Sequence, residues 1–333
     1  MTATERPKLA MYWAASCGGC EVSLANIHEA ILEVDRHFDF IFCPCLLDGK
    51  RADIEALPDG AIAVTLFNGA LRTAENLDMA RLLRQKSRLL IAFGSCAVSG
   101  GIPALANQHG LQHLLETVYR TSPTLDNPQG LVPQPVSHVA AGELELPPFL
   151  PRVLALDQAV VVDYGMPGCP PEPEQIVALI RQLASGAPLP PPCSLLGCSA
   201  RAVCDDCPRE KRGVLTPQLL RSCALIPEPG WCLLEQGIPC VGSATRGGCA
   251  ALCPSVAMPC TGCYGPLDLD ADPGAAALTA IAAAIRPPAV ELLAAGGAAR
   301  PVPSVGLTDP LGSLYRYTLA ASVVADRKPE RQP

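Results

Sequence analysis

The first half of the chain alternates short apolar runs with segments whose apolar residues recur at helical spacing. The short runs, rich in β-branched residues, predict strands at 8–16, 38–46, 61–69, 88–95 and 159–165. Helical spacing between them predicts helices at 21–34, 70–87 and 172–185. Strands and helices in alternation favour an α/β fold with a doubly wound parallel sheet.

The pattern changes after the Pro-rich stretch 185–193. Residues 193–266 hold 11 of the chain's 17 cysteines, with repeated Gly and Pro and few periodic runs. Such a segment is typical of a small irregular domain held by ligands rather than by a large core. We therefore divide the chain into domains 1–186 and 187–333, the second ending in an Ala-rich helical tail. The Pro-rich segment 121–151 is expected to be an insertion with room for a small hairpin.

Charge and hydropathy argue against a nucleic-acid partner and against a membrane-spanning segment. The net charge is −7 and no block of five Lys or Arg occurs, so no nucleic-acid partner is expected. No run of about 18 apolar residues occurs, so we expect no membrane span of its own. The N-terminus shows neither a secretion signal nor a twin-arginine pair, since Arg6 stands alone. We therefore expect a cytoplasmic protein with reduced thiols.

Four cysteines are predicted to meet at one edge of the sheet. Cys17, Cys96 and Cys169 each follow a predicted strand, and Cys20 lies in the first turn of the helix after Cys17. The carboxyl ends of parallel strands share one edge, so these four thiols would surround one metal or cluster. Glycines, which let the backbone approach a bulky inorganic group, occur nearby at Gly18, Gly19, Gly100, Gly101 and Gly168.

The Cys-rich segment offers two further sets of four thiols. One set is Cys204, Cys207, Cys232 and Cys240, and the other is Cys249, Cys253, Cys260 and Cys263. Three sets of four leave five cysteines, which we expect to be structurally buried: Cys43, Cys45, Cys193, Cys198 and Cys223.

The kind of site is the next question, because a CxxC such as Cys17–Cys20 also suits a redox dithiol or zinc. Zinc sites commonly mix His with Cys, but all five histidines precede residue 139. Cys followed by Pro recurs at 169–170, 207–208 and 253–254, as at the end of ferredoxin-type ligand runs. All-thiolate sites suit iron, so iron–sulfur clusters are favoured over a zinc scaffold and over a thioredoxin-like pair.

These motifs together resemble the small subunit of nickel–iron hydrogenases. CGGCE at 17–21, GSCAVSGG at 94–101 and PGCPPEPEQI at 167–176 resemble the motifs that hold that family's proximal cluster. CDDCPRE, CLLEQGIPC and CAALCPSVAMPCTGC resemble its distal and medial segments, although the spacing from Cys232 to Cys240 is longer than usual. The resemblance implies a flavodoxin-like domain with a proximal [4Fe-4S] cluster and a Cys-rich domain with medial and distal [4Fe-4S] clusters.

Two departures indicate the branch of that family. Cys204 stands where the periplasmic uptake enzymes typically have His, and Cys253 stands where they have Pro. The pattern is similar to the cytoplasmic methyl-viologen-reducing and soluble uptake types. Some relatives use an Asp as a cluster ligand near the position of Asp48, which is therefore a candidate proximal ligand.

The resemblance implies an electron-transfer subunit of an oxidoreductase. This chain has no CxxC near its C-terminus and no His after residue 138, so the nickel–iron centre would lie on a partner large subunit. Electrons from H2 would pass through the three clusters to a further acceptor subunit or carrier. The alternative is the cluster subunit of a quinone-reducing, complex-I-like oxidoreductase. The physiological acceptor, the direction of turnover, the oxygen tolerance and the oligomeric state are not determined by the sequence.

Overall fold

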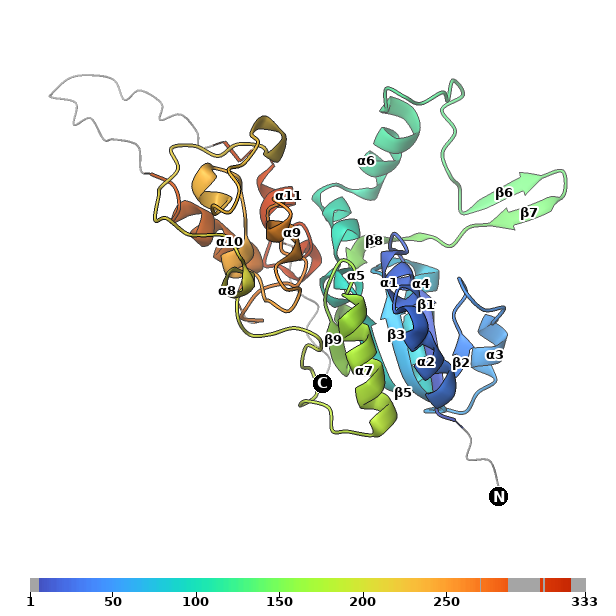
Figure 1. Ribbon diagram of the computed structural model, residues 1–333. Helices are drawn as coiled ribbons and strands as arrows, with labels where there is room; N and C mark the ends of the chain where they lie inside the picture. The colour runs from blue at the N-terminus through green and yellow to red at the C-terminus, as the bar shows by residue number, and fades with distance from the viewer. Residues whose placement is uncertain (1–5, 270, 287–305, 308, 325–333) are drawn as a thin grey trace, which may run out of the picture. The chain divides into compact units, whose positions relative to one another are not determined.

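The computed structural model describes residues 6–269, 271–286, 306–307 and 309–324 (Figure 1). The chain forms two compact units. The first comprises residues 1–197 and 317–333, and the second comprises residues 198–316. The sequence assigns the proximal cluster to domain 1–186 and the medial and distal clusters to domain 187–333. That assignment stays a prediction.

A five-stranded parallel sheet forms the centre of the first unit (Figure 1). The strand order is β2-β1-β3-β5-β9, which confirms the doubly wound α/β class and is the flavodoxin-like order. The chain adds β2 on one side of β1 and the later strands on the other side, so the strand order changes direction between β1 and β3. A ligand-binding crevice is expected at this switch point, beyond the carboxyl ends of the strands. The strands are β1 (Lys8–Trp13), β2 (Asp39–Phe42), β3 (Ile62–Asn68), β5 (Ser87–Phe93) and β9 (Tyr164–Met166).

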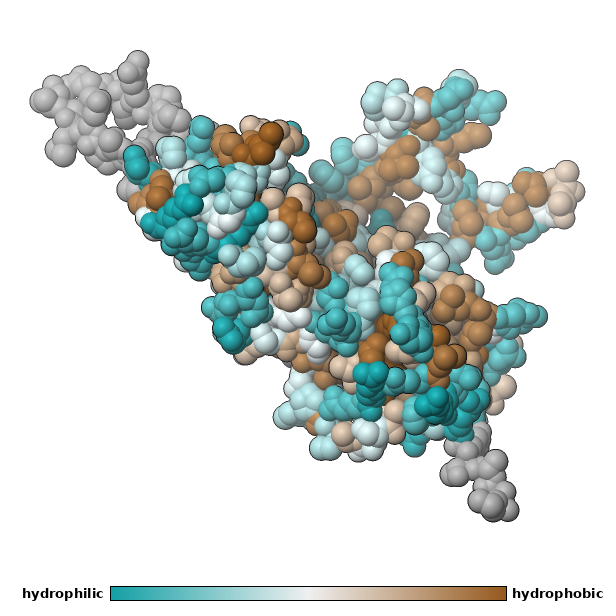
Figure 2. Space-filling view, viewed as in Figure 1, coloured by the Kyte–Doolittle hydropathy of each residue, from teal (hydrophilic) through white to brown (hydrophobic). Residues whose placement is uncertain are grey.

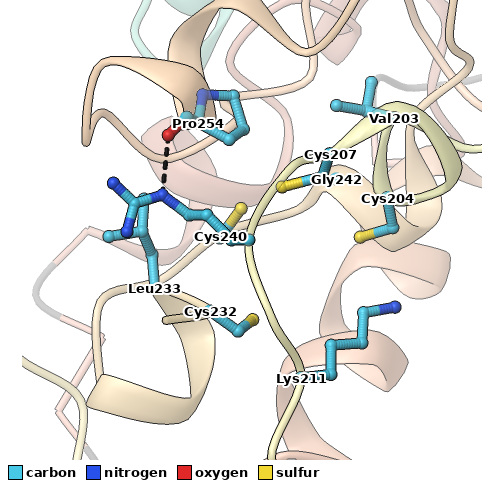
Figure 3. A pocket seen from close by; sticks show the side chains of 10 residues that line it. Val203, Cys204, Cys207, Lys211, Cys232, Leu233, Cys240, Gly242 and Pro254 are labelled. Atoms are coloured by element: carbon cyan, nitrogen blue, oxygen red, sulfur yellow. Dashed lines mark hydrogen bonds between the residues drawn. The ribbon is translucent and has the colours of Figure 1, made fainter. Parts of the chain in front are cut away.

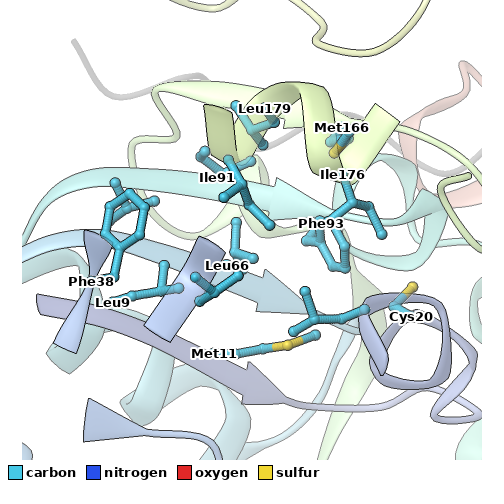
Figure 4. Close-up of a cluster of buried hydrophobic side chains, with 14 of the residues drawn as sticks. Leu9, Met11, Cys20, Phe38, Leu66, Ile91, Phe93, Met166, Ile176 and Leu179 are labelled. Atoms are coloured by element: carbon cyan, nitrogen blue, oxygen red, sulfur yellow. The ribbon is translucent and has the colours of Figure 1, made fainter. Parts of the chain in front are cut away.

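Alternate residues of each strand pack on opposite faces of the sheet. Leu9 and Met11 join one buried cluster with residues of α1, α2 and α7, and Figure 4 shows Cys20 at one end of it. Ala10 and Tyr12 join a second cluster with residues of α3 and α4. Both faces are thus covered, as a parallel sheet requires. The helices are α1 (Gly19–Ala25), α2 (Ile31–His37), α3 (Arg51–Glu55), α4 (Ala74–Lys86) and α7 (Pro173–Ser185).

Several predicted elements differ from those observed. The strand expected at 38–46 ends at Phe42, and the helix expected at 70–87 begins only at Ala74. The helix expected at 21–34 is interrupted by a 3-10 turn, His28–Ala30, and His28 has a φ of 54°. The strand expected at 159–165 is observed only as β9 (Tyr164–Met166), just after Asp163, whose N–H donates to the Leu90 carbonyl at 3.0 Å. The Asp163 carboxylate accepts hydrogen bonds from the Leu90 N–H at 2.7 Å and from Arg84 at 2.5 Å.

The insertion between β5 and β9 contains the expected hairpin. It is formed by β6 (Val136–Val139) and β7 (Gly142–Glu145), and Figure 1 shows it extending from the first unit near α6 (Leu111–Glu116). The periodicity did not predict the antiparallel pair β4 (Leu71–Thr73) and β8 (Phe149–Leu154). Figure 2 shows apolar surface on the hairpin, where Val136, Val139 and Leu144 are exposed.

The second unit has little regular structure. Its helices are α8 (Val203–Asp206), α9 (Leu252–Ser255), α10 (Pro273–Ala282) and α11 (Pro310–Leu314). A small apolar core includes Val203, Val241 and Ile281, with several cysteines packed in or against it. The expected tail helix is present as α10, whereas residues 287–305, 308 and 325–333 of that tail lie outside the described residues. Within the described part of the chain, no helix is long and apolar enough to cross a membrane.

The chain returns to the first unit near its end. The Tyr317 carbonyl accepts hydrogen bonds from the Ser99 hydroxyl at 2.7 Å and the Gly101 N–H at 3.1 Å. The Gln158 side chain donates to the Ala320 carbonyl at 2.8 Å. These bonds hold α5 (Ser95–Ser99) and the glycines that follow it, next to Cys96.

Phe67→Ala is expected to destabilise the first unit strongly. Phe67 is fully buried in β3 and its ring lies 5.3 Å from that of Tyr12, so truncation removes apolar contacts and leaves a cavity that costs about 3–5 kcal/mol. The matched control is Phe149→Ala, since Phe149 is 42% exposed and should lose less than about 1 kcal/mol. Denaturant titration followed by circular dichroism measures both, and equal losses would contradict the central position of Phe67.

Candidate metal centres

The first candidate centre lies at the carboxyl edge of the sheet. Cys17 and Cys20 flank the start of α1, Cys96 lies in the first turn of α5, and Cys169 follows β9. Burial raises the pKa of Cys20 most, followed by Glu21, and Cys96, Cys169 and Cys17 raise it further, as neighbouring thiols would. The pKa of Cys96 is likewise raised by burial and, to a smaller extent, by Cys169 and Cys17. The structure therefore brings these four together, while their role as ligands stays a prediction.

Two glycines make room for these sulfurs. A Cβ at Gly94 would lie 2.4 Å from the Cys20 Sγ, and one at Gly101 would lie 2.6 Å from the Cys96 Sγ. Both glycines also have positive φ, at 84° and 56°, which other residues rarely adopt. A bulky inorganic group fits such a cradle, because the backbone approaches the sulfurs without side chains. The sequence pointed to Gly101 as a nearby glycine, whereas Gly94 entered only as the first residue of the motif GSCAVSGG.

Burial determines the protonation of the inner pair. Cys20 and Cys96 are buried, and loss of solvent raises the pKa of Cys96 to about 12 and that of Cys20 still further. Both thiols would therefore carry protons at neutral pH in the absence of a nearby cation. A bound metal cation would displace those protons and stabilise the thiolates. The two thiols therefore fit a metal group that binds thiolates.

A buried carboxylate lies beside this centre. The Asn68 amide donates to both oxygens of Glu21, at 2.6 and 2.7 Å, and lies 2.9 Å from the Ser16 hydroxyl. Burial raises the pKa of Glu21, while the Asn68 bonds oppose that rise. Asn68 closes the apolar run of β3, and a polar residue at that place was an available signal that the sequence analysis did not use. Asn68 Oδ1 is buried without a hydrogen-bond partner in the described part of the structure.

The second candidate centre lies in the second unit. Figure 3 shows the side chains of Cys204, Cys207, Cys232 and Cys240 around a common pocket, which Lys211 also lines. Burial raises the pKa of Cys204 to about 11, and the positive charge of Lys211 opposes that rise. Arg209 fixes the wall of the pocket by donating to the Pro254 carbonyl at 2.6 Å (Figure 3). Cys240, whose spacing from Cys232 is unusual, therefore lies with the other three.

The third set is only partly defined by its contacts. Burial raises the pKa of Cys260 to about 12, with further contributions from Cys240 and Cys249. The Cys260 N–H donates to the Cys240 Sγ at 3.3 Å, so the second and third sets adjoin each other. Cys253 lies in α9 and Cys263 in the turn after Cys260. In the described residues, no three His, Cys, Asp or Glu side chains converge on the position of a single metal ion.

The remaining candidates differ in their surroundings. Asp48 is exposed in the loop between β2 and α3, and its role as a ligand stays a prediction. The expectation that the five remaining cysteines are buried is wrong for most of them. Only Cys43 is buried, whereas Cys45, Cys193 and Cys223 are exposed and Cys198 is half-buried. Cys43 and Cys45 fall in the run predicted as a strand at 38–46, but β2 ends at Phe42 and the chain turns there, while Cys193 and Cys198 lie in turns and loops.

Known proteins match either the first part of the chain or nearly all of it. Residues 17–183 match the family described as NADH ubiquinone oxidoreductase, 20 Kd subunit. The iron–sulfur subunit of an F420-non-reducing hydrogenase from Archaeoglobus profundus is 38% identical over 82% of this chain and 87% of the relative. The corresponding vhu hydrogenase subunit of Methanocaldococcus jannaschii is 34% identical over 95% of this chain and 96% of the relative.

The fold has solved counterparts. A [NiFeSe] hydrogenase structure from Desulfovibrio vulgaris Hildenborough covers 79% of this chain and 94% of its own, with 17% identity and a TM-score of 0.51. The relatives and the thiol-lined sites define the class, an iron–sulfur subunit of a hydrogenase. Within that class, the chain belongs to the family of iron–sulfur subunits of the F420-non-reducing hydrogenases. This confirms the resemblance drawn from the cysteine motifs.

Proposed function

We propose that this chain conducts electrons from H2 oxidation at a partner large subunit, which carries a nickel–iron centre, to an acceptor. Three [4Fe-4S] clusters would be held by the three thiol sets. When bound, each cluster would accept and release single electrons. The proposed ligands are Cys17, Cys20, Cys96 and Cys169 for the proximal site; Cys204, Cys207, Cys232 and Cys240 for the distal site; and Cys249, Cys253, Cys260 and Cys263 for the medial site.

The observation that carries this proposal is the proximal cradle. Four thiols from three strand ends lie together, and two glycines leave their sulfurs free of neighbouring side chains. Burial of Cys20 and Cys96 excludes water from the inner side of the site. A dry, rigid setting is what an electron carrier needs, because small structural change on reduction keeps transfer fast and burial tunes the potential.

The outer side of the same edge suits a protein partner. Cys17 and Cys169 are exposed there, and Trp13 and Val22 are 43% and 58% exposed. Trp13 is fixed against Gly18, where a Cβ would lie 3.2 Å from its ring. An aromatic anchor beside apolar residues is common at the core of protein interfaces. We therefore place the large subunit on this edge, and we propose a cytoplasmic location and a further acceptor subunit.

The second unit favours a hydrogenase over the complex-I-like alternative. The matched 20 Kd family spans residues 17–183 only, whereas the hydrogenase relatives also extend over the Cys-rich segment. Eight proposed ligands lie in that segment, and Cys240 and Cys260 connect its two sets. A subunit with a single cluster would have no use for these eight thiols.

Iron and acid-labile sulfide analysis of the anaerobically purified complex tests the cluster content. Three four-iron clusters predict about 12 iron and 12 sulfide per copy of this chain, after subtraction of the partner subunits' content. The partners purified without this chain provide the reference. Zinc without sulfide would refute the iron–sulfur assignment, and about four irons would favour the single-cluster alternative.

A further inference from the structure

A pair of thiols outside the three sets lies in the turn that follows β2. The Cys43 Sγ and the Cys45 Sγ are 3.4 Å apart. The turn is closed by the Leu46 N–H, which donates to the Cys43 carbonyl at 2.8 Å, as does the Leu47 N–H. Pro44 occupies the second position of this turn, where its fixed φ favours the fold-back. The backbone therefore holds the two sulfurs side by side.

The two thiols differ in access to solvent. Cys43 is 1% exposed and packs among core residues at the end of β2, whereas Cys45 is exposed. Burial and the neighbouring Cys45 raise the pKa of Cys43 to about 12. A reagent from solvent would therefore meet Cys45 first, with Cys43 behind it. This is the arrangement of an attacking thiol and a resolving thiol.

We propose that Cys43 and Cys45 form a reversible, redox-active disulfide that exchanges with low-molecular-weight disulfides. The Cys45 thiolate attacks a disulfide RSSR, forming a Cys45–SR mixed disulfide and releasing RS⁻. The Cys43 thiol then attacks the Cys45 sulfur as its proton passes to the departing RS group, which forms the Cys43–Cys45 bond and releases the second thiol as RSH. The two cysteines lose two electrons and two protons in total, and RSSR becomes two RSH.

The geometry supports closure of this bond. A disulfide has an S–S length of about 2.05 Å, so the sulfurs must approach by roughly 1.4 Å from their separation of 3.4 Å. Rotation of the exposed Cys45 side chain can supply that movement without displacing the buried Cys43. Core packing accounts for the buried Cys43. The exposed Cys45 beside it contributes nothing to that packing. Reversible pairs of this kind occur in reducing compartments as redox-responsive sites.

Mass spectrometry of one tryptic peptide provides the test. Cleavage after Arg36 and Lys50 releases residues 37–50, whose only cysteines are Cys43 and Cys45. The anaerobically purified complex is equilibrated with glutathione and glutathione disulfide at several ratios, quenched with acid and alkylated. We expect the internally linked peptide to exceed its singly glutathionylated form by about tenfold or more, because ring closure within a held pair outcompetes a free thiol. Dithiothreitol should restore both alkylation sites.

Single variants separate the two roles. In Cys43→Ser the resolving thiol is absent, so Cys45 should accumulate as the mixed disulfide with glutathione. In Cys45→Ser the accessible thiol is absent, and Cys43 should remain alkylatable only after denaturation. Exposed Cys193 in the same samples reports on ordinary glutathionylation. A wild-type peptide that stays dithiol, or that stops at the mixed disulfide at every ratio, would overturn the proposal. None of these readouts depends on iron content or hydrogenase activity, so the result is independent of the proposed function.

Discussion

Gly94→Ala is expected to prevent assembly of the proximal site while the rest of the protein keeps its fold. The new Cβ would lie 2.4 Å from the Cys20 Sγ, closer than non-bonded atoms approach. The sulfur cannot retreat, since Cys20 is buried against the sheet and Gly94 is anchored by its N–H, which donates to the Met166 carbonyl at 2.8 Å. We expect a loss of about four irons per chain and of the corresponding electron paramagnetic resonance signal.

Gly186→Ala is the matched control for this variant. Gly186 also has a positive φ, 67°, but its ψ of 15° is left-handed helical, which costs alanine less than the φ of 84° and ψ of 159° at Gly94. A Cβ at Gly186 meets no heavy atom within 4 Å, and the residue only ends α7. The control should therefore lose some stability, on the order of 1 kcal/mol, but no iron. Equal iron contents in the two variants would show that the Gly94 contact with Cys20 does not matter for the site.

The sheet and its thiol edge could be predicted from the sequence because both depend on local pattern. Apolar runs fix where β1, β3 and β5 lie, and the rule that parallel strands end at one edge then collects Cys17, Cys96 and Cys169. The strand predicted at 159–165 began too early, since residues 159–163 form a turn and loop before β9, where Asp163 bonds to Arg84 and to the Leu90 N–H of β5. Such long-range contacts leave no periodic signal.

Features that depend on close approach in three dimensions were not predictable. Gly94 reads as an ordinary strand-end glycine until the position of the Cys20 sulfur is known. The bonds from Asn68 to Glu21 join residues 47 positions apart, and the adjacency of Cys240 to Cys260 depends on an irregular loop. The Cys43–Cys45 pair was assigned to a predicted strand and to buried packing, because the apolar run does not show that the strand ends at Phe42. The sequence indicated the chemistry and the sets of thiols, whereas the structure was needed to show which thiols are buried and which meet solvent.

Cys96→Ser is expected to interrupt electron flow from the large subunit without stopping chemistry there. Serine nearly matches cysteine in size, so α5 should keep its packing, but a hydroxyl holds its proton and is a poor ligand for iron. With one of the four proposed proximal ligands replaced, we expect H2-dependent reduction of a viologen dye to fall by on the order of a hundredfold in the purified complex.

Exchange of deuterium gas with water protons distinguishes this loss from general damage. That exchange requires the partner's nickel–iron centre but no net electron transfer, so Cys96→Ser should retain most of it while dye reduction fails. Cys223→Ser serves as the control, since Cys223 is exposed in the second unit and belongs to none of the three sets. Full dye reduction in Cys96→Ser would remove Cys96 from the electron path. Parallel loss of both activities would instead indicate that the large subunit no longer docks. The intact proximal edge would then be needed for assembly as well as for electron transfer.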